Sequence, residues 1–210
     1  MIPVILEQVR CATLPEHEGI YRVDWAGVRT RISMLPWAPE RFAGTTSTRV
    51  PVPSDGYRSE AEEYVSLVLS LTSQTQSYRV VEAGAGWAPW AVMGIVCARR
   101  LGKHATGIAV EADPTRASWA IQHATDNGLT TELLTGSPAD IQTALKREST
   151  ADLRIVQAAV WHTATTLRFP LLDGTDMGGA VTVESEPNMD YRGANLTHVD
   201  VPTVTLNSLL

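Results

Sequence analysis

The chain has 210 residues, of which 44% are hydrophobic, and this predicts one domain with a real core and room for an appended subdomain. Its formal net charge of −6 disfavours a nucleic-acid partner, because phosphate binding needs a basic face. No apolar run reaches the roughly 20 residues that span a bilayer, and the N-terminus lacks a secretory signal pattern. We therefore expect a cytoplasmic protein with no nucleic-acid and no membrane partner.

Cysteine and histidine usage gives no sign of a metal site. Cys11 and Cys97 lie far apart, and Cys97 falls in an apolar helical stretch, where a small buried hydrophobe is the expected role. The histidines show no spacing typical of metal ligands. We expect no metal.

Residues 1–58 predict a small β-rich N-terminal extension. Residues 21–25 and 28–32 alternate apolar and polar side chains around a short turn, which is typical of a β-hairpin, and four prolines then indicate a loop or linker. Trp25 and Trp37 are candidates to line a substrate groove, although packing against the main domain is the use we favour. A role as a substrate-side cap and a role as an oligomer contact both stay open.

Residues 59–210 alternate helices with strands, which predicts an α/β fold. A capping box at Ser59–Glu62 opens the first helix, and His123 lies on a helix face where a structural role is favoured over a ligand contact. The expected helices are 59–75, 91–101, 114–127 and 139–147. The expected strands are 80–81, 105–110, 131–134, 153–161, 166–169, 180–183 and 199–206.

The central motif is the stretch Arg79–Trp90, RVVEAGAGWAPW, in which an apolar strand runs through an acid and a glycine turn into a helix. Gly84 and Gly86 let the backbone approach a ligand, and the following helix N-terminus offers unpaired N–H groups to an anionic group. This predicts the opening unit of a nucleotide-binding fold. The dinucleotide fingerprint needs a third glycine, and its absence near Pro89 disfavours NAD.

A second strand ends in Glu111, 29 residues after Glu82, which fits one strand–helix–strand unit. A carboxylate at this strand tip can accept hydrogen bonds from both ribose hydroxyls, and beside a glycine turn we favour this role over that of a solvated strand end. The small residue Ala158, near the end of a later buried strand, either leaves room for an adenine edge or packs tightly in the core.

The run Glu82-Ala83-Gly84-Ala85-Gly86 resembles motif I of the S-adenosylmethionine-dependent methyltransferases of Rossmann-like fold. More narrowly, residues 50–210 resemble the FkbM-type methyltransferases. The matching segments are VVEAGAGWAPWAV, RRLG, VEADP, HATDNGL, QAAVW, RFP, YRG and VPTVTLNSLL, of which the tryptophan-containing turn is the most specific.

The resemblance implies a Rossmann-like methyltransferase sheet flanked by helices, with S-adenosylmethionine as cofactor. Trp87 lies either over the cationic sulfonium or in a packing contact that anchors the following helix. The cofactor-binding residues that it implies are Glu82, Gly84, Ala85, Gly86, Trp87, Glu111, Ala112 and Ala158.

Two departures from the family pattern concern the sheet. The predicted helix at 139–147 looks like an insertion, because in the family the strand corresponding to residues 157–161 follows the Asn-Gly helix end closely. The family's core strand of the form Asp-Leu-Leu-Lys-Ile-Asp-x-Glu-Gly has no counterpart here. We expect a sheet that is incomplete at the C-terminus, with an open central edge. A partner strand covers this edge, or residues 153–161 occupy it, or the chain is a truncated homologue, which is the explanation we favour.

The expected function is O-methylation of a small-molecule or saccharide hydroxyl, and the alternative is a non-catalytic, truncated homologue that binds cofactor or acts as an interaction module. The expected partners are the hydroxylated acceptor and a second copy that covers the sheet edge. A general base would have to be His162, Asp173 or Asp176, and none of the three stands out, so no catalytic residue is assigned.

Overall fold

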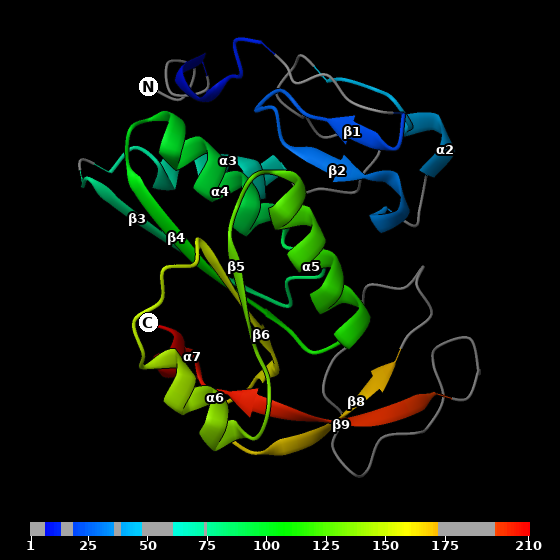
Figure 1. Cartoon of the computed structure of the whole chain (residues 1–210), viewed down its shortest axis with the longest axis vertical. Helices are drawn as coiled ribbons and strands as arrows, with labels where there is room; N and C mark the ends of the chain where they lie inside the picture. Colours follow the sequence, from blue (N-terminus) through cyan, green and yellow to red (C-terminus); the bar gives the residue numbers. More distant parts are fainter. Residues whose placement is uncertain (1–6, 14–18, 36–38, 48–60, 74, 172–195) are drawn as a thin grey trace.

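The computed structural model describes residues 7–13, 19–35, 39–47, 61–73, 75–171 and 196–210. Its elements in chain order are β1 Tyr21–Val23, β2 Arg29–Arg31, the short 3-10 turn η1 Ile32–Met34, α2 Pro39–Phe42, α3 Ala61–Ser70, β3 Ser77–Ala83, α4 Pro89–Arg100, β4 His104–Glu111, α5 Pro114–Asp126, β5 Thr131–Leu134, α6 Pro138–Leu145, β6 Leu153–Gln157, β7 Ala159–Val160, β8 Thr166–Leu171, β9 Thr197–Val204 and α7 Leu206–Leu209. The α/β class is confirmed (Figure 1).

The main sheet has four strands, all parallel, in the order β3-β4-β6-β5. Parallel strands bring their carboxyl ends to one edge of the sheet, where ligands of open α/β folds bind. Strand β4 lies between β3 and β6, just as the second strand of a doubly wound sheet lies between the first and the third. The correspondence holds if β5 and α6 are left out of the count. This arrangement is compatible with a Rossmann-like fold. In it β5 is an added strand at the edge of the sheet, paired with β6, and α6 is the helix that joins the two.

The two faces of the sheet carry separate apolar clusters. One face packs against α3, α4 and α5 in the largest cluster, which includes Ile95, Ala109 and Ile155. The other face packs against α6, α7 and the end of β9, through side chains such as Ile141 and Leu209. Burial on both faces is expected for a parallel sheet, and it explains the nearly continuous apolar sequence of β4 and β6.

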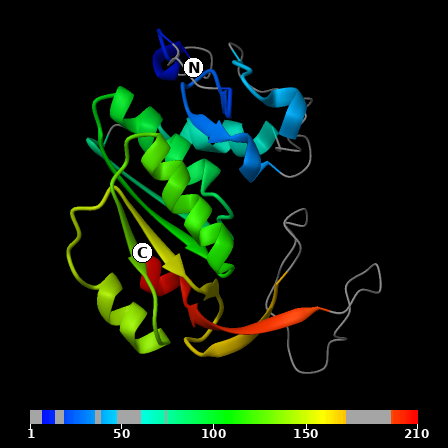
Figure 2. The same ribbon diagram turned by 45° about the vertical axis from the view of Figure 1, so that its right-hand side comes forward.

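The strand expected at 153–161 is broken in the structure. Residue Ala158 interrupts it, so that β6 stays in the main sheet while β7 pairs in parallel with β9 in a second sheet. β9 in turn pairs antiparallel with β8 over six residue pairs, and this ribbon extends away from the main sheet (Figures 1 and 2). Because β6 lies between β4 and β5, residues 153–161 do not occupy the outer side of β3, and that explanation for the open edge was wrong.

The N-terminal hairpin is confirmed, since β1 pairs antiparallel with β2. Trp25 is only 1% exposed and belongs, with Val9 and Val28, to the same cluster as α3, α4 and α5. Its indole therefore packs in the core, as favoured from the sequence. Trp37 and the strand expected at 180–183 lie outside the described residues.

Within the described part of the chain, no helix is both long and apolar enough to cross a membrane.

Candidate functional site

The turn between β3 and α4 has three residues in the left-handed backbone region. Gly84 and Gly86 have φ values of 66° and 56°, and Ala88 has a φ of 58°. The conformation is natural for glycine but costs an alanine roughly 1–2 kcal/mol. The turn is closed by bonds from Ala88 N to the Ala85 carbonyl (2.7 Å) and from Ala85 N to the Val110 carbonyl of β4 (3.0 Å). Such strain persists only where the surrounding structure holds the backbone in place.

Glu82, the acid before the turn, caps helix α4. Its carboxyl oxygens accept hydrogen bonds from Ala91 N at 2.7 Å and from Trp90 N at 3.4 Å. Pro89 has no N–H, and Ala88 at the N-cap has no capping side chain, so the helix needs an acceptor from elsewhere. The expectation that these N–H groups are open to an anionic ligand was therefore wrong.

Burial raises the pKa of Glu82 from 4.5 to about 8, because desolvation outweighs the two backbone hydrogen bonds and nearby Glu63 and Glu111 add repulsion. Glu82 is consequently protonated over much of the neutral range. A protonated carboxyl still accepts the bond from Ala91 N through its carbonyl oxygen. The site thus combines a neutral acid beneath the helix with a second acid on the neighbouring strand.

Glu111 joins the tip of β4 to the glycine turn. One carboxylate oxygen accepts a hydrogen bond from Gly86 N at 2.7 Å, and the other accepts one from Asp113 N at 2.8 Å. Its side chain is buried, and desolvation raises its pKa. Each oxygen of a carboxylate can accept a further bond, so these contacts leave acceptor capacity for a ligand hydroxyl.

The two acids that define the predicted pocket lie at the same end of the sheet. Glu82 on β3 is paired with Ala109 on β4, and Ala109 lies two residues before Glu111 on β4. Another acid, Asp113, is engaged differently, because its carboxylate caps α5 by accepting from Thr115 N and Arg116 N. Glu111 is therefore the acid at this strand tip that faces the turn.

The remaining predicted cofactor-binding residues are divided between the turn and the core. Gly84 is exposed, and a Cβ built on it would meet nothing within 4 Å, so space is open above the turn. Ala85, Ala112 and Ala158 are buried at 3%, 5% and 1% exposure. Ala112 packs with Phe169 of β8 and Val201 of β9 in one cluster.

Ala158 lies in the cluster that contains Val204 and Leu209, and its N–H donates to the Glu111 carbonyl. Its contacts are those of tight core packing.

Trp87 turns toward the N-terminal segment. Its side chain packs with Ile32 and Leu35, next to Phe42, and its carbonyl oxygen lies 3.0 Å from His123 Nδ1. The side chain therefore packs against the segment that follows the N-terminal hairpin. His123 is 1% exposed, and burial lowers its pKa to about 4, so the ring is neutral at physiological pH.

The structure supplies no strong candidate for a general base. His162 is exposed in the segment between β7 and β8, and its ring stacks at a tilt on Trp161, with the ring centroids 5.0 Å apart. Asp173 and Asp176 lie outside the described residues. Among the residues that the structure describes, no group of three His, Cys, Asp or Glu side chains could hold a metal ion.

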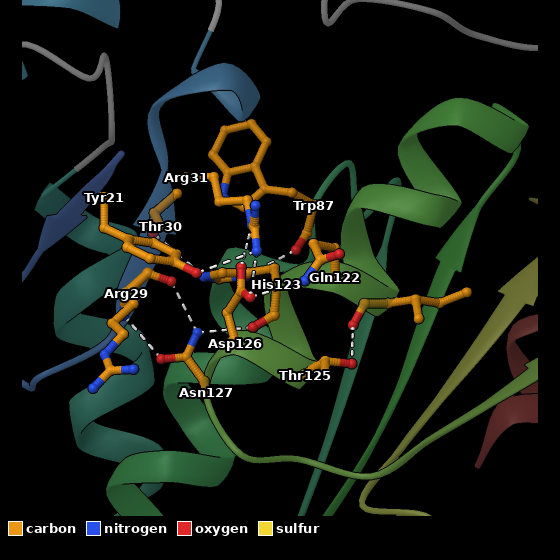
Figure 3. A network of polar contacts seen from close by, with 11 residues as sticks. Tyr21, Arg29, Thr30, Arg31, Trp87, Gln122, His123, Thr125, Asp126 and Asn127 are labelled. Carbon is orange, nitrogen blue, oxygen red and sulfur yellow. Dashed lines mark hydrogen bonds and ion pairs between the residues drawn. The ribbon is translucent and has the colours of Figure 1, made fainter. Parts of the chain in front are cut away.

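Sequence reasoning missed the contacts between the hairpin and helix α5. They are made by Arg29 and Arg31 on β2 and by Asp126 and Asn127 at the end of α5 (Figure 3). The Asn-Gly pair signalled the helix end but gave no indication of a partner nearly a hundred residues away.

Comparison with known proteins gives no match to any family model, curated protein or solved structure.

Proposed function

We propose that the glycine turn binds S-adenosylmethionine and that the protein is a cytoplasmic methyltransferase of FkbM type, acting on a hydroxyl of a small molecule or saccharide. The single observation that carries this proposal is the position of Glu82. Its carboxyl group accepts from Ala91 N at 2.7 Å and from Trp90 N at 3.4 Å, the first backbone N–H groups of α4.

This position separates two classes of nucleotide ligand. A dinucleotide places its pyrophosphate on the helix N-terminus, where the N–H groups and the helix dipole stabilise negative charge. Here the N–H groups of Trp90 and Ala91 already donate to Glu82, so they are not available to a phosphate. An adenosyl sulfonium has no phosphate, so it needs no helix N-terminus. In this proposal the ribose hydroxyls bond to an acid at the next strand tip, and Glu111, which accepts from Gly86 N of the turn, would be that acceptor.

The chemistry would be direct displacement: an acceptor oxygen bonds to the sulfonium methyl carbon as the bond from carbon to sulfur breaks. The sulfur leaves neutral, and the hydroxyl proton passes to water or to a base that we do not assign. Such a reaction depends mainly on holding donor and acceptor in line at near-attack distance. A preformed turn such as this one, tied to β4 by Glu111, would fix the donor side.

Calorimetric titration tests the proposal. We expect S-adenosylhomocysteine to bind the folded protein and NAD to show no heat of binding. A folded protein that binds NAD, or that binds neither compound, would contradict the proposal.

The Glu111→Ala variant should bind S-adenosylhomocysteine more weakly by about 1–3 kcal/mol, because charge-assisted bonds to the ribose are lost. The Glu111→Gln variant is the matched control for shape, with the free energy of unfolding measured for both variants, since the residue also accepts from Gly86 N and Asp113 N. An affinity equal to that of the wild type in Glu111→Ala would remove this residue from the site.

A second candidate function is cofactor binding without catalysis, as an interaction module. It is favoured by the position of β3 at the edge of the four-stranded sheet, with Ala83 and Gly84 exposed beside the turn. In the described part of the chain, no strand pairs with the outer side of β3, so no strand there encloses a site for a methyl acceptor. Assays with labelled methyl donor and hydroxylated acceptors distinguish the two functions, and a second copy of the chain at this edge would appear in sedimentation as a dimer.

A further inference from the structure

The N-terminal hairpin is fastened to helix α5 by backbone and side-chain bonds (Figure 3). The Asn127 amide accepts from Arg29 N at 2.8 Å and donates to the Arg29 carbonyl at 2.9 Å. It thereby satisfies both backbone groups of one strand residue, as a neighbouring strand would. Its donor group also lies 2.8 Å from the His123 carbonyl, which links the hairpin to the last turns of the helix.

An ion pair lies beside this contact. Arg31 of β2 donates two hydrogen bonds to Asp126, at 2.6 and 2.9 Å, and the Asp126 side chain is only 7% exposed. Gln122 donates to the same carboxylate at 2.8 Å, and Arg31 also reaches the Tyr21 hydroxyl at 3.2 Å. The geometry with two parallel bonds fixes orientation as well as distance.

His123 continues the network from the hairpin to the glycine turn. Its Nδ1 faces the Trp87 carbonyl, which can only accept, so Nδ1 carries the proton. Its Nε2 is then the acceptor for the Thr30 hydroxyl, 3.3 Å away on β2. One neutral ring thus bonds the turn on one side and the hairpin on the other.

The same two parts of the chain also meet through an apolar contact. The Trp87 side chain packs with Ile32 and Leu35, which lie in η1 and at its end, directly after β2. The next residue, Ala88, is the alanine with a φ of 58°. Trp87, which precedes the strained Ala88, is therefore held both at its carbonyl oxygen and at its indole ring.

We propose that the hairpin and His123 brace the glycine turn in its strained conformation, so that hairpin docking and ligand binding at the turn are coupled. Without the brace, Ala88 would relax to a right-handed backbone and the turn would shift. The bonds from Ala88 N to the Ala85 carbonyl and from Gly86 N to Glu111 would then be disturbed. Coupling of this kind is reciprocal: a ligand that requires the turn tightens the hairpin. The identity of that ligand rests on the proposed function, whereas the brace itself does not.

Amide hydrogen exchange in the full-length protein tests the brace without any ligand. The reporters are the amides of Ala85, Gly86 and Ala88 in the turn, referenced to Ile108 and Val110 in β4. An asparagine amide reproduces the position of Nδ1, and a glutamine amide that of Nε2. We expect His123→Gln to speed exchange at the turn about tenfold, the effect of one lost buried hydrogen bond. We expect His123→Asn to stay near the wild-type rate.

Equal exchange at the turn in His123→Asn and His123→Gln, or acceleration that is the same at the β4 reference amides, would overturn the proposal. A second variant acts from further away. Asn127→Ala removes the bonds to Arg29, and we expect faster exchange at the turn amides as well as at Arg29 N. Acceleration confined to Arg29 N would contradict the coupling.

The strain itself is tested with Ala88→Gly, because glycine adopts the left-handed conformation freely. In this background the brace has little left to hold, so His123→Gln should change exchange at the turn by less than about threefold. An effect as large as in the wild-type background would refute the role assigned to Ala88.

A titration with S-adenosylhomocysteine supplies the ligand arm. We expect weaker binding to His123→Gln than to His123→Asn, and slower exchange at Arg29 N in the complex. If the wild-type protein does not bind this probe, the proposed function fails, but the exchange measurements without ligand still decide whether the brace exists. If the probe binds equally to both variants, the coupling is refuted while the proposed function stands.

Discussion

Glu82→Gln should make the protein more stable at alkaline pH. The folded chain raises the pKa of Glu82 from 4.5 to about 8, so between these values the folded state keeps a proton that the unfolded chain has lost. Stability therefore falls as pH rises through this window. Glutamine is a neutral copy of the protonated acid, and its carbonyl oxygen can still accept from Ala91 N.

The gain in stability can be worked out from the shift in the pKa of Glu82. One pKa unit corresponds to about 1.4 kcal/mol, which gives an upper value of about 5 kcal/mol for ionising Glu82 above pH 8. Because Glu82 is only partly buried, water reduces this cost, and we expect about 2–4 kcal/mol. Denaturant titrations of both proteins between pH 5 and pH 9 measure it as a difference in the free energy of unfolding.

The expected result is a small advantage for the variant at pH 5, where the unfolded acid has already begun to ionise, that widens up to about pH 8 and levels off above it. The comparison cancels the contribution of other acids with a raised pKa, such as Asp24, whose burial raises its pKa to about 6. Glu148→Gln, a change at an exposed position beyond α6, is the matched control and should leave the curve unchanged. Parallel curves for the wild type and Glu82→Gln would refute the reasoning.

Two further predictions concern packing and the hairpin contact. Gly107→Ala should lower the free energy of unfolding by about 1–3 kcal/mol in a denaturant titration, because the new methyl would lie 3.0 Å from Leu153 Cδ1 and from Val80 Cγ1. Gly19→Ala meets no atom within 4 Å and is the control; equal effects would contradict the packing argument. Asp126→Asn should cost about 1–2 kcal/mol by removing the charge that pairs with Arg31. Desolvation opposes ionisation of Asp126, but the bonds from Arg31 and Gln122 outweigh it and lower its pKa, so the loss should vanish as the pH falls through that lowered pKa. Glu7→Gln, in an exposed pair with Arg10, should cost less than about 0.5 kcal/mol, and a similar loss in both variants would argue against a special role for the hairpin contact.

Local patterns predicted much of the fold. Apolar runs, caps and glycine turns predicted α4, β4 and α5 nearly at their observed bounds, because these features depend on residues close in sequence. They located β3 but not its length, since the expected residues 80–81 are only the middle of Ser77–Ala83. The position of β6 between β4 and β5 was not predicted, since an apolar run fixes burial but not the neighbour of a strand. The interruption at Ala158 was missed for the same reason.

The candidate site was predicted in outline. The glycine turn and Glu111 follow from spacing, and the structure brings them within hydrogen-bond distance. The cap made by Glu82 was missed, although Ala88 and Pro89 leave the helix start without a local acceptor, and that gap is a usable signal. The pairing of Asn127 with Arg29 spans 98 residues and depends on how the hairpin packs, which no local pattern records.

The most direct test of the account is a map of amide chemical shifts in the isotopically labelled protein during addition of S-adenosylhomocysteine and, separately, of NAD. We expect S-adenosylhomocysteine to shift the amides of Gly84, Gly86 and Ala112, and NAD to leave them in place. Shifts caused by NAD at the first turn of α4, or a set of shifts from S-adenosylhomocysteine that avoids the glycine turn, would contradict it.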